Sequence, residues 1–248
     1  MTERLALSGE ESEFEDFLIL NPVGRERLVK KYKDNAFGQS FGWNWLAIPY
    51  NRVAMINHLI HRIGPDCRYL EIGCDLDVVF HAVPLANKVG VDPVSGGNRR
   101  MTSDQFFAEN TDTFDLIFID GLHTHDQLHR DVENALRVIR PGGFILLHDM
   151  LPRDWREEHV PRLHGFWTGD VWKVGFELAT TPGLEFRVAL IDHGVGVLKA
   201  PAKPVTAIVD MRPALATERF AYYHSNIDVL PKLTWDECLD WIAGQGTA

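Results

Sequence analysis

The sequence has 248 residues, 45% of them hydrophobic and 24% charged, which is the profile of a globular protein with one large domain. Its formal charge of −10 disfavours a nucleic-acid partner, and no apolar run approaches the roughly 20 residues that a membrane helix needs. The acidic N-terminal stretch lacks the basic and then apolar order of a signal peptide, and the 3 cysteines form no CxxC pair. We therefore expect a cytoplasmic enzyme or binding protein, with no disulfide framework, zinc finger or membrane partner.

Residues 1–48 are predicted to form an irregular or helical extension of a main domain at 49–248. Apolar residues of the segment 14–18 lie at helical spacing, and residues 37–45 are rich in glycine and aromatic side chains. We favour a flap that packs over the main domain. The functional alternatives are a lid over an active site or a contact between the subunits of a homodimer.

An alternation of helices and strands follows the extension. The helix that starts at Pro49 has one apolar face and ends at Gly64-Pro65. A helix between residues 120 and 141 carries an apolar stripe, and Pro141-Gly142-Gly143 is predicted to turn the chain into the next strand. Continuous apolar segments indicate strands that are buried on both faces, as in a parallel sheet between helices. These four strands are predicted at 68–73, 88–92, 114–120 and 143–149.

The last third of the sequence predicts a helix at 170–181 and strands at 184–192 and 195–199. The link His193-Gly194 is too short for a parallel crossover, so the two strands are expected to form an antiparallel hairpin. A short amphipathic helix is expected at 234–243. The fold class is therefore α/β, with a doubly wound, mostly parallel sheet that ends in an antiparallel hairpin.

Ligands of open α/β sheets bind at the carboxyl ends of the strands, where this sequence is strongly polar. Gly73, directly after the first strand, allows close approach of the backbone to a ligand. The full G-x-G-x-x-G pattern is absent, because Asp75 and Asp77 stand where further glycines are expected. Two carboxylates would repel a pyrophosphate, which counts against NAD, FAD and nucleoside triphosphates. Glu71 and Asp75 instead suit a ligand with an ammonium group.

Two further positions favour a nucleoside. Asp92 ends the second strand, where a carboxylate can hold both hydroxyls of a ribose, and we prefer this interpretation to a plain cap of the next turn. Ser103-Asp104 either caps a helix or contacts an adenine amino group, and both can hold at once. A ligand with an amino-acid end, a ribose and an adenine is S-adenosylmethionine.

Several segments carry a family resemblance: YLEIGC at 69–74, VGVDP at 89–93, TSDQFF at 102–107, FDLIFIDGLHTHDQLHRDVENALRVIRPGGFILLHDMLP at 114–152, GDVWK at 169–173 and LIDHGVGVL at 190–198. They resemble class I S-adenosylmethionine-dependent methyltransferases. Within that class they are similar to a bacterial small-molecule and sugar O-methyltransferase family, and more distantly to macrocin and catechol O-methyltransferases. The first loop, CDLD at 74–77, departs from the glycine-richer sequence of the family.

The resemblance implies a Rossmann-like methyltransferase fold with S-adenosylmethionine as the cofactor and Asp120 near the methyl donor. Cofactor contacts are implied at the ends of the first, second and third strands and at the start of the helix that follows the second. On this basis we assign cofactor binding to Glu71, Gly73, Cys74, Asp75, Asp92, Pro93, Ser103, Asp104, Asp120, Gly121 and His123.

Carboxylates and imidazoles cluster after the third and fourth predicted strands, where Asp120, His123, His148 and Asp149 are the candidate catalytic residues. Methyl transfer to a hydroxyl requires removal of the hydroxyl proton, and an imidazole with a pKa near neutrality suits that role. His123 is the first candidate for this base and His148 is the second. The simplest alternative for Asp149 is a cap of the turn that follows it.

In a second mechanism, Asp120 and Asp149 bind a divalent cation such as magnesium, which lowers the pKa of the substrate hydroxyl. Met150 stands where the catechol-type pattern has an asparagine, and a thioether cannot bind a hard metal. A metal site built on the histidines is a third option. The spacing of His123, His125 and His148 matches no hydrolase signature, so this option ranks lowest.

The pocket for the methyl acceptor is predicted beside the exit of the fourth strand. Residues 164–173 place tryptophans, a histidine and a lysine there, and aromatic side chains stack on the faces of sugars or rings. Trp172 and Phe176 are expected in the core. Arginines after the fourth strand either recognise an anionic acceptor or belong to the surface. We assign substrate binding to His125, Arg153, His164 and Trp167, and the alternative for His125 is a solvated helix residue.

The sequence thus predicts an S-adenosylmethionine-dependent methyltransferase that methylates a hydroxyl of a small molecule or glycan precursor. The first alternative is a non-catalytic binding protein with the same fold, favoured by the glycine-poor first loop. The second is a nicotinamide-dependent oxidoreductase. This alternative lacks the dinucleotide fingerprint, and the terminal hairpin is atypical for it.

Overall fold

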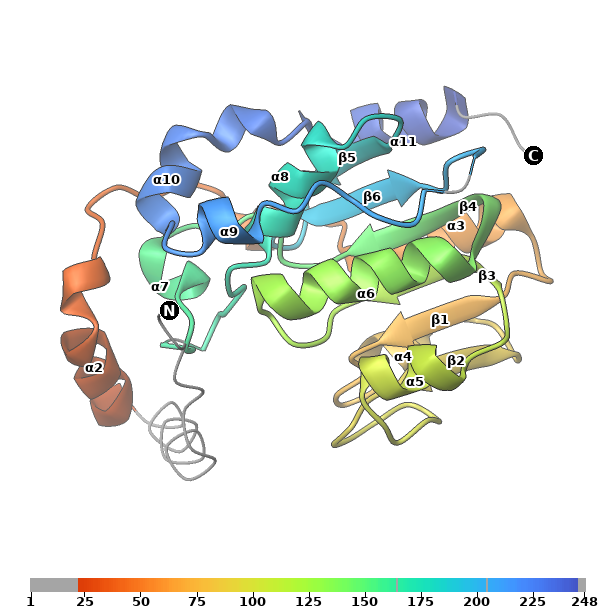
Figure 1. Cartoon of the computed structure of the whole chain (residues 1–248), viewed down its shortest axis with the longest axis horizontal. Coiled ribbons are helices and arrows are strands. Elements are labelled where there is room, and N and C mark those ends of the chain that lie inside the picture. Colours follow the sequence, from red (N-terminus) through yellow and green to blue (C-terminus); the bar gives the residue numbers. More distant parts are fainter. Residues whose placement is uncertain (1–21, 164, 204, 245–248) are drawn as a thin grey trace.

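The computed structural model describes residues 22–163, 165–203 and 205–244, and its centre is a seven-stranded sheet with the strand order β2-β1-β3-β4-β6-β5-β7 (Figure 1). The pairs β1–β2, β1–β3 and β3–β4 are parallel, whereas β6 is antiparallel to both β4 and β5. This arrangement confirms the predicted mostly parallel sheet that ends in an antiparallel hairpin. The strands are β1 (Tyr69–Ile72), β2 (Lys88–Val91), β3 (Phe114–Ile119), β4 (Ile139–Leu147), β5 (Glu185–Ala189), β6 (Val195–Lys199) and β7 (Lys232–Leu233).

Helices cover both faces of the sheet because successive strand residues point to opposite sides. In β3, Ile117 and Ile119 join one core with α5, α6, α8 and α10, whereas Leu116 and Phe118 join another with α3, α4 and α11. Burial on both faces explains the continuous apolar strands of the sequence. The helices are α2 (Pro22–Lys31), α3 (Arg52–Ile63), α4 (Val78–Ala82), α5 (Ser103–Glu109), α6 (His125–Val138), α7 (Trp155–Glu158), α8 (Trp172–Thr180), α9 (Arg212–Leu215), α10 (Phe220–Ser225) and α11 (Trp235–Gly244).

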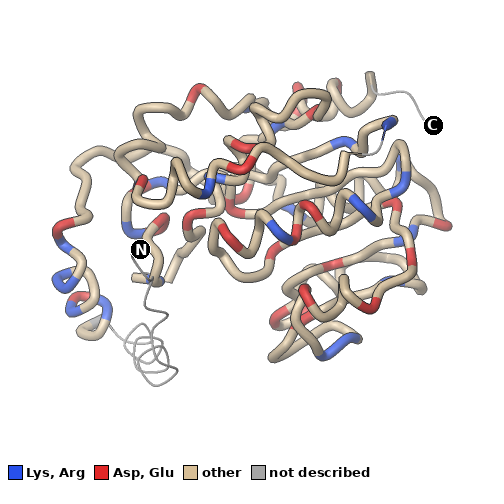
Figure 2. The backbone as a smooth tube through the Cα atoms, in the orientation of Figure 1, with Lys and Arg blue, Asp and Glu red and all other residues tan. Residues whose placement is uncertain are grey.

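Acidic and basic residues are interspersed along the described chain, so the net negative charge is not gathered on one element (Figure 2). The helix α2 is locally basic, with the sequence PVGRERLVKK. Among the described residues, no helix combines the length and the apolar character needed to cross a membrane.

Several predicted boundaries differ from the structure. The first strand of the hairpin ends at Ala189 and not at 192, so residues 190–194 join β5 to β6 in place of the predicted link His193-Gly194. The helix expected from Pro49 begins at Arg52, because the side chain of Asn51 caps it by accepting a hydrogen bond from the Ala54 amide at 3.2 Å. The segment from Pro141 to Gly143 lies inside β4 and not between a helix and a strand. Ile139 already pairs with Phe114, and a register shift then accommodates the two glycines.

The described part of the N-terminal extension packs against α10 through aromatic rings. The ring of Phe41 stacks on Trp43 at 4.3 Å and on His224 at 4.6 Å, and it meets the edge of Tyr223 at 5.7 Å. The Phe41 amide also donates a hydrogen bond to the Arg153 carbonyl at 2.9 Å. These contacts are those of a packing flap, whereas the lid and the homodimer contact stay predictions. The segment 14–18 lies outside the described residues.

The carboxyl ends of β1 and β3 approach each other closely at Gly73. This glycine has φ +87°, and a Cβ atom on it would lie 2.2 Å from the carbonyl oxygen of Asp120. Only glycine therefore allows the two strand ends to meet at this distance.

Replacing Gly73 by alanine is expected to lower the free energy of unfolding by about 3 kcal/mol, because the new methyl group meets backbone and the φ angle is strained. Chemical denaturation measures this change. Gly38→Ala is the matched control, since a Cβ at Gly38 has nothing within 4 Å, and a change within about 0.5 kcal/mol is expected. Equal stability of the two variants would contradict the close approach.

Candidate active site

A cavity of about 890 Å³ opens at the carboxyl ends of β1, β2, β3 and β4, where ligands of open α/β sheets bind. Loops from all four strands line it, together with Arg52 and Arg162. The structure brings most of the predicted site residues to this cavity, and what they bind stays a prediction. The predicted residues in its lining are Glu71, Gly73, Cys74, Asp75, Asp92, Pro93, Ser103, Asp120, Gly121, His123, His148, Asp149 and Trp167.

The loop after β1 forms its turn with aspartates in place of the expected glycines. Asp75 has φ +45° and Asp77 has φ +61°, both in the left-handed region that aspartate tolerates better than most residues. Asp77 Oδ1 accepts a hydrogen bond from the Gly97 amide at 2.6 Å, which ties the loop to the segment after β2. The CDLD sequence therefore supports a turn that places Cys74 and Asp75 in the cavity lining.

Asp92 is held by backbone amides of both neighbouring loops. Its Oδ1 accepts hydrogen bonds from Val94 and Ser95, both at 2.8 Å, and its Oδ2 accepts one from Asp75 at 3.1 Å. Burial alone would raise the pKa of Asp92, but these hydrogen bonds outweigh it and lower the pKa. The carboxylate is therefore ionised at neutral pH. It caps the turn and also faces the cavity, so the two predicted roles are compatible.

Glu71 is a buried carboxyl beneath the cavity. The hydroxyl of Tyr69 donates a hydrogen bond to its Oε2 at 2.6 Å, which favours the ionised form. Burial acts in the opposite direction and, with the nearby charge of Asp120, raises the pKa of Glu71 to about 7. A cationic ligand in the cavity would stabilise the ionised carboxylate.

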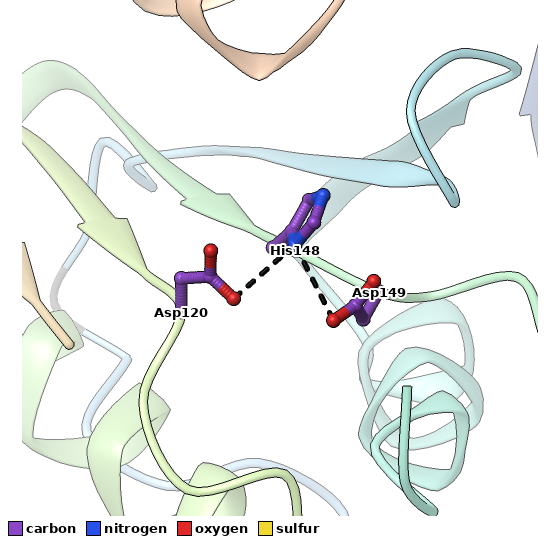
Figure 3. A group of neighbouring side chains, drawn as sticks. All are labelled: Asp120, His148 and Asp149. Carbon is purple, nitrogen blue, oxygen red and sulfur yellow. Dashed lines mark hydrogen bonds and ion pairs between the residues drawn. The ribbon is translucent and has the colours of Figure 1, made fainter. Parts of the chain in front are cut away.

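The side chains of Asp120 and Asp149 both point toward the ring of His148 (Figure 3). Asp120 follows β3, whereas His148 and Asp149 follow β4. The Nδ1 atom of His148 lies 3.2 Å from Asp120 Oδ1 and 3.4 Å from Asp149 Oδ2. Burial alone would lower the pKa of His148, but the charges of the two aspartates outweigh it and raise the pKa well above its ordinary value.

His123 approaches the same aspartates from the loop before α6. Its Nε2 lies 3.3 Å from Asp120 Oδ1, and its Nδ1 lies 3.0 Å from the carbonyl oxygen of Trp167. The rings of His123 and Trp167 stack at 5.0 Å. Burial alone would lower the pKa of His123, but the hydrogen bond to Asp120 and the charge of Asp149 raise it. The carbonyl oxygen can only accept, so Nδ1 carries a hydrogen and Nε2 is the nitrogen that exchanges a proton.

Sequence reasoning missed a pair that completes this cluster. Asp192, in the turn between β5 and β6, accepts hydrogen bonds at Oδ2 from the amide of Arg52 at 3.0 Å and from its Nη1 at 2.8 Å. The Nε atom of Arg52 lies 3.7 Å from Asp120 Oδ2. The first residue of α3 thus brings a cation to the ends of the strands. The sequence signal was weak, because Arg52 lies before the first strand and Asp192 ends a segment that was predicted to be a strand.

The cluster also fits a divalent cation. One ligand atom from each of Asp120, His148 and Asp149 lies within 4.8 Å of the other two. Carboxylate oxygens and an imidazole nitrogen are common ligands of such metals. Met150, whose thioether was excluded as a ligand from the sequence, is fully buried in the core.

Some assigned residues lie outside the cavity lining. His125 is buried, with Nε2 3.0 Å from Glu177 Oε1, so it is neither a solvated residue nor placed to contact an acceptor. The guanidinium of Arg153 donates to Glu157 at 2.9 Å and is therefore already paired. His164 lies outside the described residues.

The start of α5 also differs from the expectation. Thr102, and not Ser103 or Asp104, caps this helix by accepting a hydrogen bond from the Gln105 amide at 3.2 Å. Asp104 lies outside the cavity lining and instead accepts from Gln127 Nε2 at 3.3 Å. An adenine contact by Asp104 is therefore not supported, whereas Ser103 remains in the lining.

Replacing His125 by alanine is expected to lower the free energy of unfolding by about 2 kcal/mol, because the fully buried Glu177 loses a hydrogen-bond donor. Denaturant titration measures this loss. His61→Ala on the exposed side of α3 is the control and should change stability by less than about 0.5 kcal/mol. A neutral His125→Ala variant would contradict a structural role.

Comparison with known proteins places a methyltransferase sequence at the centre of the chain. Residues 89–150 match the model of a family described as a methyltransferase domain. No curated protein matches the chain.

An O-methyltransferase from Bacillus cereus, solved in complex with SAH, is similar in structure at 17% identity, covering 78% of this chain and 97% of that chain with a TM-score of 0.44. An SAH-bound methyltransferase from Podospora anserina is also 17% identical, covering 81% of this chain and 99% of that chain with a TM-score of 0.47. The fold class rests on the strand order itself, and the family match confirms the resemblance to methyltransferases over residues 89–150.

Proposed function

We propose that this protein transfers the methyl group of S-adenosylmethionine to a hydroxyl of a small molecule or glycan precursor in the cytoplasm. The observation that carries the proposal is a single cavity that joins two carboxylates suited to the cofactor, Glu71 and Asp92, to the aspartates and histidines around His148. The methyltransferase sequence at 89–150 supports the same chemistry.

The cofactor would lie along the loops after β1, β2 and β3. Asp92 would accept hydrogen bonds from the ribose hydroxyls, and Glu71 would compensate the ammonium group. The exposed side chains of Val94 and Leu122, at 84% and 60%, offer apolar surface in the cavity lining for the adenine ring. When bound, the cofactor supplies an electrophilic methyl group, and the protein supplies alignment and a base.

His123 is the better base of the two histidines. Both ring nitrogens of His148 face acceptors, because Nε2 lies 2.9 Å from the Asp192 carbonyl oxygen and Nδ1 faces two carboxylates. Both nitrogens of His123 also face acceptors, but its side chain is more exposed than that of His148, at 20% against 7%. Nε2 would take the hydroxyl proton, and Asp120, 3.3 Å away, would stabilise the imidazolium that forms. If a metal ion is used, Asp120, His148 and Asp149 would hold it, and it would lower the pKa of the acceptor hydroxyl.

Calorimetric titration with S-adenosylmethionine tests the proposal directly. Micromolar binding is expected, and Asp92→Asn should weaken it at least about tenfold, because a ribose loses a charged acceptor. Absence of binding at millimolar cofactor would overturn the proposal and favour the non-catalytic alternative. A fluorescence change on addition of NADH, without any response to S-adenosylmethionine, would favour the oxidoreductase.

The affinity for S-adenosylmethionine is expected to rise with pH through about 7. Glu71 carries a proton below its pKa of about 7, and only the ionised carboxylate compensates an ammonium group, so affinity falls by up to about tenfold per pH unit below that value. Calorimetry at pH 6, 7 and 8, about one unit below this pKa, near it and about one unit above it, measures how the affinity changes with pH. Glu71→Gln should flatten it, whereas Asp92→Asn should lower affinity and keep the slope. An unchanged slope in Glu71→Gln would refute this assignment.

His123→Ala is expected to reduce turnover by about 10²- to 10⁴-fold with cofactor affinity nearly intact, because the variant lacks the base and keeps the carboxylates of Glu71 and Asp92. Single-turnover rates and calorimetric Kd values separate the two effects. His61→Ala serves as the control and should change neither. Equal loss of turnover and cofactor affinity in His123→Ala would argue against a base.

A further inference from the structure

We propose that Asp170 is a positioning residue for His123: it caps the N-terminus of α6 from the segment 167–170 and so fixes the orientation of the His123 ring in the cavity. The inference rests on the proposed function, in which His123 is the base. Its test follows the histidine ring and one backbone amide directly, so it requires neither cofactor nor turnover.

The N-terminus of α6 takes its cap from another part of the chain. The first amides of a helix have no partner within the helix, and the side chain of the residue before it commonly accepts from one of them. Thr124 holds that position and makes no such hydrogen bond. Asp170 Oδ1 instead accepts a hydrogen bond from the His125 amide at 2.7 Å. A carboxylate also suits the positive end of the helix dipole, so Asp170 fixes the start of α6.

Lys173 keeps the carboxylate of Asp170 in place. Its Nζ donates a hydrogen bond to Asp170 Oδ2 at 2.9 Å, and its amide donates to the Asp170 carbonyl oxygen at 3.2 Å. Asp170 is 3% exposed and Lys173 is fully buried. A buried carboxylate needs hydrogen bonds and a compensating charge, and Lys173 supplies both. The two carboxylate oxygens of Asp170 are therefore committed, one to Lys173 and one to α6.

The backbone beside Asp170 contacts the backbone of His123. Gly169 has φ +62°, and a Cβ atom on it would lie 1.8 Å from the carbonyl oxygen of His123. Glu157 holds the segment as well, because its carbonyl oxygen accepts hydrogen bonds from the Thr168 amide at 2.9 Å and the Gly169 amide at 3.1 Å. Since no side chain fits between the two backbones, a shift of this segment also displaces His123.

Trp167, at the start of the same segment, orients the ring of His123. Its carbonyl oxygen lies 3.0 Å from Nδ1, and the two rings stack at 5.0 Å. Asp149 Oδ2 lies 3.3 Å from the same nitrogen. A carbonyl or carboxylate oxygen accepts, so Nδ1 carries the hydrogen and the neutral ring is the Nδ1–H tautomer. Only in this tautomer does Nε2 offer a lone pair to the proton of an acceptor hydroxyl.

The cap acts on the backbone of α6 and not on the imidazole of His125. This imidazole faces Glu177 on α8, with Nε2 3.0 Å from Oε1, whereas Asp170 binds the amide. Substitution at Asp170 therefore removes the cap and leaves the pair of His125 and Glu177 in place. A displacement of a reacting group by about 1 Å costs about 10²-fold in rate, so a cap that fixes His123 contributes to catalysis without touching the substrate.

Two double variants isolate the cap. The asparagine variant, Asp170→Asn with Lys173→Met, removes both charges and keeps a carbonyl oxygen that can accept from the His125 amide. The alanine variant, Asp170→Ala with Lys173→Met, lacks this oxygen. Neither variant leaves a buried charge unpaired, so both are expected to fold. Nuclear magnetic resonance of the full chain with isotope-labelled histidine, at a pH where His123 is neutral, identifies the tautomer of its ring, and His123→Ala assigns the signals.

The asparagine variant is expected to keep the Nδ1–H tautomer of the unmodified chain, and the alanine variant is expected to lose it. Exchange of the His125 amide with solvent deuterium should be about tenfold faster in the alanine variant than in the asparagine variant, because one hydrogen bond is absent. The same tautomer in both variants, or the same exchange rate in both, would each overturn the inference.

The unmodified chain provides a readout that does not depend on the folding of a variant. Circular dichroism identifies an unfolded double variant, and in that case the unmodified chain decides. Its His123 ring should be the Nδ1–H tautomer, and its His125 amide should exchange at least about tenfold more slowly than in an unstructured peptide. The Nε2–H tautomer or an unprotected amide would contradict the inference.

Failure of this inference and failure of the proposed function are distinguishable. Absence of S-adenosylmethionine binding, with different His123 tautomers in the two double variants, would refute the proposed function alone. Binding of S-adenosylmethionine, with the same tautomer in both variants, would refute the positioning role of Asp170 alone.

Discussion

The close approach of the carboxyl ends of β1 and β3 is the constraint on which the site depends. Gly73 contacts the backbone at Asp120, and the parallel pairing of β3 with β4 then places Asp120 beside His148 and Asp149. Since both faces of these strands are buried, the strands cannot slide without exposing a core. The fold therefore brings together two aspartates that would repel one another in isolation.

The electrostatic balance of the cluster explains how it can be buried. Asp120, Asp149 and Asp192 are compensated by Arg52 and by the two histidines that lie between them. The histidines keep raised pKa values because the aspartates outweigh the effect of burial. A cationic cofactor or a metal would enter a site that already carries an excess of carboxylates over permanent cations, which is the charge that such ligands require.

Much of the architecture follows from local sequence patterns. Continuous apolar segments predicted the central strands, and the short His193-Gly194 link predicted the hairpin, because these features depend on residues that are neighbours in the chain. The polar residues after each strand predicted most of the cavity lining for the same reason. The prediction of a turn at Pro141–Gly143 was wrong, because the register of this segment is set by pairing with Phe114 on another strand.

Residues whose role depends on distant partners could not be predicted. Arg52 reaches the site only because the start of α3 lies next to the turn between β5 and β6, 140 residues away in the sequence. His125 resembles the other histidines of the cluster, yet it faces Glu177 on α8 and becomes a core residue. Histidines near one strand end thus divide into site and core according to which helix packs against them.

A crystal structure of the protein with SAH tests the central claim most directly, since it locates the ligand relative to the residues of the cavity. The account predicts the ribose against the carboxylate of Asp92 and the sulfur on the side of Asp120 and His123. Ligand bound outside the cavity at the ends of β1 to β4, or no ligand at saturating SAH, would contradict it.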